Sequence, residues 1–221
     1  MYIPRALEPV VKRYSQHFKV VVVTGPRQVG KTTMLKHLME QESQERDIAR
    51  SYVSLDNTSI RQVAKTDPAL FLQRYHPPIL IDEIQKAPEL LPYIKEVVDS
   101  SEQTGLFWLT GSQPFHLMSA VSESLAGRAG VVEMLGLSAS EIYGAPSETF
   151  GATPDYFMRR VSTRQARDVT EVYADICKGS LPAIRALPDD LRAGGYESYL
   201  DTYIMRDIRD LAQVGDELKF R

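Results

Sequence analysis

The hydrophobic positions of the first 135 residues fall into five short runs that are rich in β-branched side chains. These runs occupy residues 19–24, 52–55, 79–82, 106–110 and 131–135. Their length and composition are typical of buried strands. Between them, the apolar positions repeat with helical periodicity at residues 31–42, 58–73, 88–100 and 114–126, with a break at Asp67-Pro68. The chain is therefore predicted to alternate strand and helix.

This alternation indicates an α/β fold. Strand–helix–strand units place their strands parallel, with helices on both faces of the sheet. Residues 20–23 are consecutive valines, and such a continuous apolar strand fits a sheet that is buried on both faces.

A change of pattern after Leu137 predicts a second part of the chain. Strand signals stop there, and residues 144–154 are rich in turn-forming residues. Helical patterns follow at residues 156–165, 168–178 and 196–212. We therefore expect an α/β domain over residues 1–150 and a helical subdomain over residues 151–221. Because residues 216–221 carry no helix-stop signal, we also expect the chain to be a fragment of a longer protein.

A glycine-rich turn lies between the first predicted strand and the first predicted helix. Residues 25–32 read GPRQVGKT, which matches the phosphate-binding pattern G-x-x-x-x-G-K-[ST] in the strand-to-helix context that it requires. In such a loop the main-chain N–H groups turn toward phosphate oxygens, Lys31 reaches the β- and γ-phosphates, and Thr32 places a hydroxyl on Mg²⁺. A glycine-rich turn without a ligand is the alternative. The residues expected to bind nucleotide are Gly25, Pro26, Arg27, Gln28, Val29, Gly30, Lys31, Thr32 and Thr33.

Two carboxylates end the third predicted strand. Asp82 and Glu83 follow an apolar run, and ligands of open parallel sheets bind at the carboxyl ends of the strands. Asp82 fits a ligand of Mg²⁺, directly or through water, and Glu83 is suited to polarise the water that attacks a γ-phosphate. Alternatively, Asp82 caps the next segment and Glu83 is a solvated charge. The phosphate-binding pattern upstream favours the first interpretation.

Three further side chains are candidates for catalysis. The fourth predicted strand ends in small hydroxyl residues, of which Thr110 is the first candidate and Ser112 the second for contact with the γ-phosphate or its water. A local turn or helix cap formed by these hydroxyls is the alternative. Arg128 precedes the fifth predicted strand and is a candidate arginine finger, which would neutralise charge as the phosphate leaves. For Arg128 the alternative is a surface arginine stabilised at a helix C-terminus.

Composition and charge exclude several classes of protein. The chain has 221 residues, with 26 Lys and Arg against 29 Asp and Glu, for a net charge of −3. These proportions are typical of a globular protein, and the interspersed charges provide no overall attraction to nucleic acid. The N-terminus carries no apolar signal segment, and no apolar run approaches the roughly 20 residues of a membrane span. The single cysteine, Cys177, argues for a reducing compartment, so a cytoplasmic location is expected.

Taken together, the motifs resemble those of the AAA+ branch of the P-loop ATPases. The resemblance is closer to a widespread bacterial and archaeal group of predicted AAA ATPases, and it covers nearly the whole chain. The matching segments are YIPR (2–5), TGPRQVGKTT (24–33), YVSLD (52–56), DPALFL (67–72), IDEIQKAPELL (81–91), LTGSQ (109–113), SESLAGR (122–128) and TYIMRDIRDL (202–211).

This resemblance implies a P-loop fold with a five-stranded parallel sheet of order 5-1-4-3-2. It places Walker A at residues 25–32, Walker B at Asp82 and Glu83, and sensor 1 near residues 110–112. Arg128 takes the position where such ATPases often place a finger that acts on a neighbouring subunit. Chains of this group usually continue into a winged helix and a further C-terminal domain.

The helical subdomain matches the lid of this group less well. Residues 178–182 read KGSLP, which resembles the Gly-x-Pro element of the lid but departs from the usual pattern at Lys178, Ser180 and Leu181. A simple turn between helices is therefore an alternative. Arg206 and Asp207 lie in another matching segment, and a solvated helix face is the favoured interpretation for them.

These features predict a Mg²⁺-dependent ATPase in which hydrolysis of ATP moves the helical lid and changes contacts with a macromolecular partner. A nucleotide-operated switch or scaffold with little turnover of its own is one alternative, and a phosphotransferase that uses the same loop is another. No Asn-Lys-x-Asp pattern occurs, which weighs against a GTPase. The expected partners are ATP and either further copies of the chain or another protein. Nucleic acid is a possible partner by family analogy alone, and no membrane partner is expected.

Overall fold

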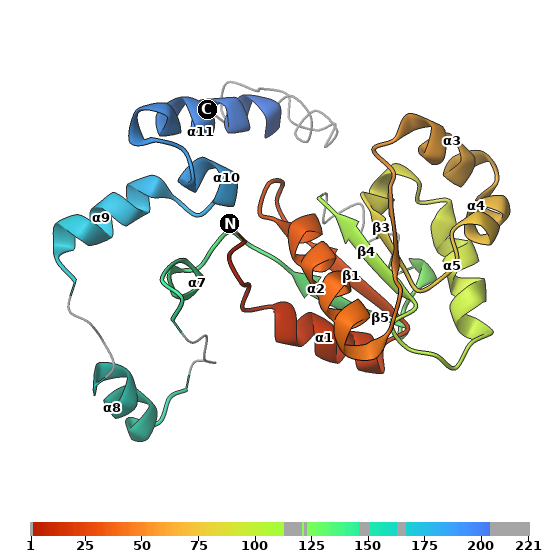
Figure 1. Cartoon of the computed structure of the whole chain (residues 1–221), viewed down its shortest axis with the longest axis horizontal. Coiled ribbons are helices and arrows are strands. Elements are labelled where there is room, and N and C mark those ends of the chain that lie inside the picture. The colour runs from red at the N-terminus through yellow and green to blue at the C-terminus, as the bar shows by residue number, and fades with distance from the viewer. Residues whose placement is uncertain (1, 113–120, 122, 146–150, 163–166, 204–221) are drawn as a thin grey trace. The chain divides into compact units, whose positions relative to one another are not determined.

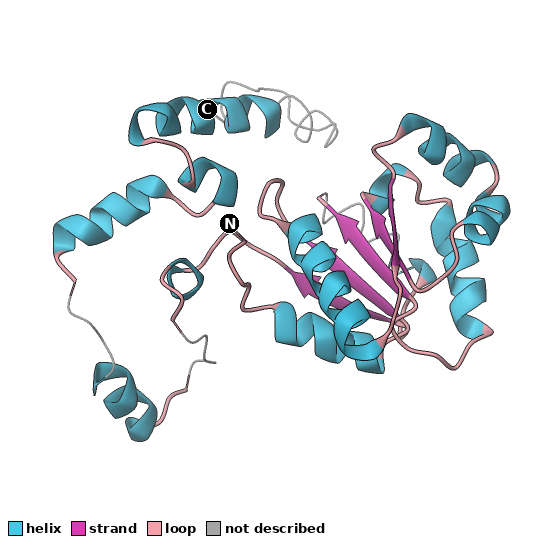
Figure 2. Cartoon of the chain, viewed as in Figure 1, coloured by secondary structure: helices cyan, strands magenta, loops and turns pink. Residues whose placement is uncertain are grey.

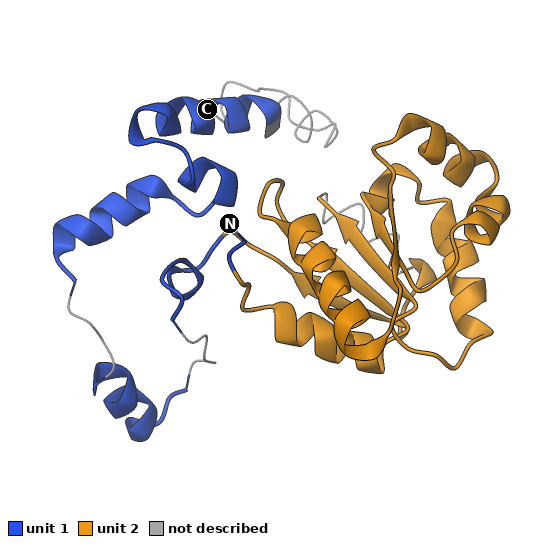
Figure 3. Ribbon diagram, in the orientation of Figure 1, with its two compact units in different colours: residues 1–3, 137–221 blue, residues 4–136 orange. Residues whose placement is uncertain are grey.

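The computed structural model describes residues 2–112, 121, 123–145, 151–162 and 167–203. The chain divides into two compact units (Figure 3), which we call the sheet unit and the helical unit. The sheet unit is Pro4–Gly136, and the helical unit combines Met1–Ile3 with Leu137–Arg221.

Five parallel strands form the centre of the sheet unit (Figure 2). Their order is β2-β3-β4-β1-β5, which confirms the predicted α/β fold and is the predicted order viewed from the other edge. The strands are β1 (Val20–Thr24), β2 (Ser51–Ser54), β3 (Ile79–Asp82), β4 (Phe107–Gly111) and β5 (Ala129–Glu133). Every residue of β1, β3 and β4 is buried, as continuous apolar strands covered on both faces require.

Strand β5 begins two residues earlier than the run at 131–135 predicted. Ala129 and Gly130 pair with Val20 and Val21 of β1. A Cβ atom on Gly130 would lie 2.6 Å from the ring of Tyr14, so the start of this strand needs a residue without a side chain. Such a strand end has no apolar run by which the sequence could reveal it.

Helices precede and connect the strands of the sheet unit, as Figure 1 shows. They are α1 (Glu8–His17), α2 (Lys31–Arg46), α3 (Thr58–Thr66), α4 (Pro68–Arg74), the 3₁₀ helix η1 (Ile84–Lys86) and α5 (Leu90–Asp99). The break predicted at Asp67-Pro68 separates α3 from α4, and Asp67 accepts a hydrogen bond from the Leu70 amide at 2.9 Å. Helix α1 was not predicted, because Val11 is its only buried apolar side chain. The helix predicted over residues 114–126 lies mostly outside the described residues.

The described part of the helical unit contains helices only. They are α7 (Ala139–Ile142), α8 (Pro154–Ser162), α9 (Val169–Lys178), α10 (Pro182–Arg185) and α11 (Asp189–Tyr203). Helix α11 begins seven residues before the pattern at 196–212 predicted, because Gly194 and Gly195 interrupt the apolar periodicity without ending the helix. The end of that predicted segment, from residue 204 on, lies outside the described residues.

Candidate functional site

The loop between β1 and α2 curls through three residues with positive φ angles. These are Gly25 (φ 137°), Gln28 (φ 62°) and Gly30 (φ 95°), in a region that glycine enters freely and other residues at a cost of about 1–2 kcal/mol. A neighbour also confines Gly25, because a Cβ atom on it would lie 2.0 Å from the carbonyl oxygen of Met134. Gly30 is the N-cap of α2 and has no side chain to bond the first amides of that helix. The curl therefore presents main-chain N–H groups at a helix N-terminus, which is a favourable place for an anion.

Lys31 begins α2, and its ammonium group lies over this loop. The residue is 6% exposed, and Nζ donates hydrogen bonds to the carbonyl oxygens of Gly25 at 2.9 Å and Pro26 at 2.7 Å. A phosphate oxygen is a stronger acceptor for an ammonium group than these neutral carbonyls. Lys31 is thus a buried positive charge beside the loop amides. Of the other predicted loop residues, Val29 is buried, Pro26, Arg27 and Thr32 are half-buried, and Gln28 and Thr33 are exposed.

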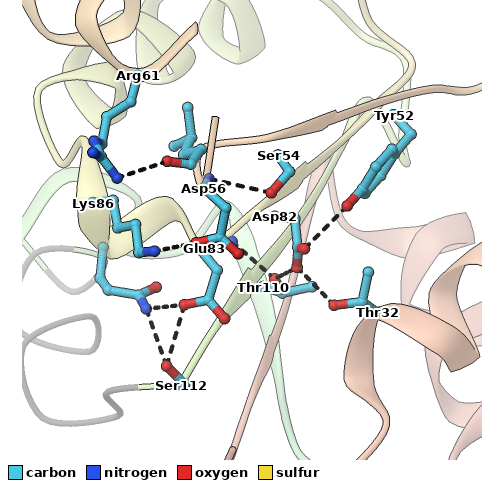
Figure 4. Close-up of polar contacts among 12 residues, drawn as sticks. Thr32, Tyr52, Ser54, Asp56, Arg61, Asp82, Glu83, Lys86, Thr110 and Ser112 are labelled. Atoms are coloured by element: carbon cyan, nitrogen blue, oxygen red, sulfur yellow. Dashed lines mark hydrogen bonds and ion pairs between the residues drawn. The ribbon is translucent and has the colours of Figure 1, made fainter. Parts of the chain in front are cut away.

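Asp82 is 7% exposed and receives hydrogen bonds from three hydroxyl groups (Figure 4). Thr32 Oγ1 donates to Oδ1 at 2.7 Å, and Thr110 Oγ1 donates to the same oxygen. The Tyr52 hydroxyl donates to Oδ2 at 3.2 Å. Strand order brings these groups together, because β3 lies between β2 and β4 and the loop leaves the carboxyl end of β1. The structure therefore places the predicted Mg²⁺ ligands Thr32 and Asp82 in direct contact.

Tyr52 is a member of this cluster that the sequence analysis did not assign to the site. It lies on β2, and the ammonium group of Lys36 on α2 is 3.7 Å from the centre of its ring. Burial raises the pKa of the Tyr52 phenol, and the negative charge of Asp82 raises it further. The phenol is therefore a neutral donor to Asp82 across the physiological range of pH.

Glu83 follows β3 in a left-handed backbone conformation, with φ 61° and ψ 47°. Its carboxylate oxygen Oε2 accepts hydrogen bonds from Ser112 Oγ at 3.2 Å and from the side-chain amide of Gln85. Gln85 also donates to Ser112 Oγ at 3.2 Å, so the three side chains form a closed set of contacts (Figure 4). A non-glycine residue held in this conformation is a common sign of a functional site. Gln85, like Tyr52, was not predicted to contribute.

Thr110 joins the two carboxylates. It is fully buried, donates to Asp82 and accepts a hydrogen bond from the Glu83 amide at 3.1 Å. Together with the contact of Ser112 with Glu83, this bonding links the end of β4 to the end of β3. Both hydroxyls therefore lie beside the acidic pair, and their contact with the γ-phosphate or its water stays a prediction.

Arg128 lies away from this cluster. It directly precedes β5, and Ala129 pairs with Val20 at the start of β1, whereas the glycine-rich loop follows the end of β1. Thr24, the last residue of β1, lies four residues after Val20, so Arg128 and the loop are separated by more than about 13 Å along the strands, at about 3.3 Å per residue. The Arg128 guanidinium bonds both oxygens of Asp99, with Nη2 at 3.0 Å from Oδ2. Hydrogen bonding by Arg128 lowers the pKa of Asp99.

The predicted lid element forms a turn between α9 and α10. Gly179 has φ 69° and ends α9, and a Cβ atom on it would lie 1.6 Å from the Tyr196 hydroxyl oxygen. Its carbonyl oxygen accepts a hydrogen bond from Arg185 at 3.1 Å. The positive φ angle favours glycine at the end of the helix, and the Tyr196 hydroxyl leaves no room for a side chain at this position. Arg206 and Asp207 lie outside the described residues.

The donor groups at the ends of β1 and β3 fit a magnesium ion that is shared with phosphates. Mg²⁺ in such sites commonly has one or two protein ligands and completes its shell with phosphate oxygens and water. Thr32 Oγ1 and Asp82 Oδ1, the oxygens that would serve as those ligands, lie 2.7 Å apart. Within the described ranges, no group of three or more His, Cys, Asp or Glu residues could hold a metal ion by itself. A search of the same ranges found no helix with the length and apolar character to cross a membrane.

Comparisons with known proteins agree with this geometry. Residues 17–143, more than half of the chain, match a protein family described as an AAA domain. Two uncharacterized proteins, one from Mycobacterium bovis and one from Mycobacterium tuberculosis, are each 32% identical to this chain over 153 residues. The alignment covers 68% of this chain and 33% of each relative, so the matched segment spans about a third of their length.

Among solved structures, the chain is similar to a Walker-type ATPase from Pyrococcus abyssi. The TM-score is 0.55 at 14% identity, and the match covers 96% of this chain and 75% of the other. This likeness concerns the fold, whereas the family match concerns the sequence that carries the glycine-rich loop and the acidic pair. The chain therefore belongs to the AAA domain family of P-loop ATPases, as its motifs predicted.

Proposed function

We propose that this protein binds ATP with Mg²⁺, hydrolyses it, and couples the reaction to a change of conformation that acts on a macromolecular partner. The observation that carries the proposal is the convergence of three polar strand ends. The loop after β1, the acidic pair at the end of β3 and the hydroxyls at the end of β4 are joined by hydrogen bonds through Thr32, Asp82 and Thr110. Ligands of open parallel sheets bind at this edge.

Each side chain has one proposed role. The loop amides and Lys31 bind the phosphates, and Thr32 and Asp82 hold Mg²⁺, which neutralises phosphate charge when it is bound. Glu83 orients a water molecule and accepts one of its protons as the water oxygen bonds to the γ-phosphorus. The bond from that phosphorus to the oxygen of the β-phosphate breaks, which yields ADP and inorganic phosphate. Thr110 and Ser112 position the two carboxylates.

One observation favours a second candidate, a nucleotide-operated switch with little turnover of its own. The Glu83 carboxylate already accepts hydrogen bonds from Ser112 and Gln85. Arg128 of the same chain lies at the other end of the strands, beside the start of β1. If Arg128 acts as a finger, a second copy of the chain supplies it. We therefore propose self-association, or a protein partner that completes the site, rather than activity of an isolated chain.

The proposed location is the cytoplasm. Cys177 is an exposed free thiol, and free thiols persist in reducing compartments. Nucleic acid enters as a partner by analogy with the family, because the net charge of −3 supplies no general attraction to it.

The proposed role of Glu83 is tested by Glu83→Gln, which keeps the shape of the side chain and removes its basicity. We expect this variant to bind ATP with Mg²⁺ as the wild type does and to lose about 10²–10⁴-fold in the rate of phosphate release. Glu89→Gln is the matched control, because Glu89 is an exposed glutamate near the start of α5. Equal rates of phosphate release in the wild type and in Glu83→Gln would reject the assignment.

A further inference from the structure

Arg5 reaches the glycine-rich loop from the segment that precedes α1. The residue is 6% exposed. Its guanidinium nitrogen Nη1 donates a hydrogen bond to the carbonyl oxygen of Val29 at 2.7 Å. Val29 lies between Gln28 and Gly30, the two loop residues that have positive φ angles at this end of the loop. Arg5 therefore bonds the loop between two residues that have positive φ angles.

The other nitrogen of the same guanidinium bonds the chain beyond β5. Nη2 donates to the carbonyl oxygens of Leu135 at 2.8 Å and Gly136 at 3.1 Å. Charged donors make stronger hydrogen bonds than neutral ones, and burial reduces competition from water. One side chain thus joins the carbonyl group of Val29 to two carbonyl groups that lie more than a hundred residues later in the sequence.

The segment after β5 also contacts the other end of the loop. The Met134 amide donates to the carbonyl oxygen of Thr24 at 2.8 Å, and Gly25 lies so close to the Met134 carbonyl that no side chain fits between them. The loop is therefore supported at its first residue by Met134 and near its last residue by Arg5.

The main chain of Arg5 is itself fixed. Its amide donates to Glu8 Oε1 at 2.7 Å, and the Glu8 amide donates to the Arg5 carbonyl oxygen at 3.1 Å. These bonds tie the residue to the first turn of α1. The guanidinium consequently projects from a main chain that two hydrogen bonds with Glu8 hold in place.

We propose that Arg5 is a positioning residue for nucleotide binding, which holds the glycine-rich loop in the curl that accepts phosphate by bridging Val29 to Leu135 and Gly136. The inference rests on the proposed function, because it assigns the loop to phosphate. It is specific to arginine, since the planar fork carries donors in two directions and a lysine ammonium is a single point of contact.

The test compares Arg5→Met and Arg5→Lys with a matched control, Arg50→Met. Arg50 is the other buried arginine of the sheet unit, at 8% exposed, and it donates to the Gly105 carbonyl oxygen at 2.8 Å. Gly105 lies just before β4, at the amino ends of the strands, whereas the loop lies at their carboxyl ends. All variants are measured for thermal stability, for amide hydrogen exchange in peptides that cover residues 25–30, and for calorimetric affinity toward a non-hydrolysable ATP analogue with Mg²⁺.

We expect Arg5→Met to weaken affinity for the analogue about tenfold or more, as loss of a charged hydrogen bond to the loop predicts. Exchange at residues 25–30 should become faster in the nucleotide-free variant. Arg50→Met should lower the melting temperature and leave both the affinity and the loop exchange as in the wild type. Arg5→Lys should not restore wild-type affinity, because one nitrogen cannot span the two sets of carbonyls.

Wild-type affinity and wild-type loop exchange in Arg5→Met would overturn the proposal and reduce Arg5 to a stabilising residue. Full rescue by Arg5→Lys would overturn it as well, because charge alone would then suffice. If Arg5→Met does not fold, Arg5→Lys decides by the same two measurements. If the wild type does not bind the analogue, the proposed function fails, while the exchange data still decide whether Arg5 holds the loop.

Discussion

The contact of Gly25 with Met134 is the tightest constraint on the glycine-rich loop. Gly25 has φ 137°, and its absent Cβ would lie 2.0 Å from the Met134 carbonyl oxygen. The motif requires a glycine at this position for the approach of phosphate. In this chain the packing of the loop against the segment after β5 requires it too.

Gly25→Ala should therefore displace the loop. We expect a loss of stability of at least about 1–2 kcal/mol from the backbone conformation alone, with loss of nucleotide binding because the amides no longer converge. Denaturant unfolding and calorimetric titration measure the two effects. Gly127→Ala is the control, since Gly127 has φ 75° but no described residue lies within 4 Å of an added Cβ. Nucleotide binding by Gly25→Ala at wild-type affinity would contradict this account of the loop.

Two buried threonines of the sheet differ in how well their hydroxyls are bonded. Thr110 Oγ1 contacts both Asp82 and the Glu83 amide, whereas Thr24 Oγ1 has no hydrogen-bond partner among the residues that the structure describes. Thr110→Val should cost about 1–3 kcal/mol of unfolding free energy, because it removes the acceptor of the Glu83 amide and one of the three hydroxyl donors to Asp82. Thr24→Val should be neutral or stabilising. Equal losses in the two variants would show that the contacts of Thr110 carry no stability.

Among the secondary-structure elements, those with their own apolar pattern were predictable. Strand β3 was predicted with its observed limits, and α9 within one residue. The start of β5 was not, because Gly130 is selected by packing against Tyr14 rather than by burial of an apolar side chain. Sequence patterns report where apolar side chains recur, even in α9, which has no buried side chain among the described residues. They give no signal at Gly130, where the fold requires the absence of a side chain.

The N-cap residue of helix α9 makes the stability of this helix depend on pH. Asp168 is its N-cap and accepts hydrogen bonds from the Thr170 hydroxyl and from the Thr170 amide at 2.7 Å, which lower the pKa of the carboxyl group below its ordinary value. Since the folded pKa is lowered, the stabilisation is present above the ordinary value of 3.8 and is lost as pH falls through the folded pKa.

Asp168→Asn retains a good cap and removes the titration. We expect the wild type to be more stable than Asp168→Asn at about pH 5, and the difference to be smaller at a pH well below the ordinary value of 3.8. Urea unfolding followed by circular dichroism at the two pH values measures it. A difference that is constant with pH would show that the charge of Asp168 does not contribute to the helix.

At the scale of the sheet unit, the amino ends and the carboxyl ends of the parallel strands carry different polar residues. The loop, Asp82 and Glu83 lie at the carboxyl ends of the strands, while Arg128 lies at their amino ends, beside Asp99. Within one chain these groups cannot act together. A catalytic Arg128 therefore requires a second copy of the chain. The amino ends of the strands in that copy would lie against the site of the first.

Arg128→Ala tests this arrangement. If Arg128 completes a neighbouring site, the variant should bind ATP normally and lose about 10³–10⁵-fold in turnover, and specific activity of the wild type should rise with protein concentration. Mixing Arg128→Ala with Glu83→Gln should recover activity, because some pairs combine two intact halves. Asp99→Asn is the control, since it breaks the ion pair and keeps the arginine. A wild-type rate that is independent of concentration, together with an active Arg128→Ala, would contradict the arrangement.

The sequence predicted the centre of the site better than its support. Local motifs made candidates of the loop, Asp82, Glu83 and the hydroxyls at the end of β4, because each lies at the end of a strand with its own apolar run. Tyr52 reaches Asp82 only because β2 pairs with β3, and Arg5 bonds residues that are 24, 130 and 131 positions away. Single polar residues of this kind have no local signature, and the tertiary fold gives them their partners.

Calorimetric titration of the folded protein with ATP and Mg²⁺, in parallel with Lys31→Ala, tests the central claim most directly. The account predicts saturable binding to the wild type and a loss of measurable affinity in Lys31→Ala, because the variant lacks the buried ammonium group that lies over the loop. An absence of binding heat for the wild type, or equal affinity in the two proteins, would contradict it.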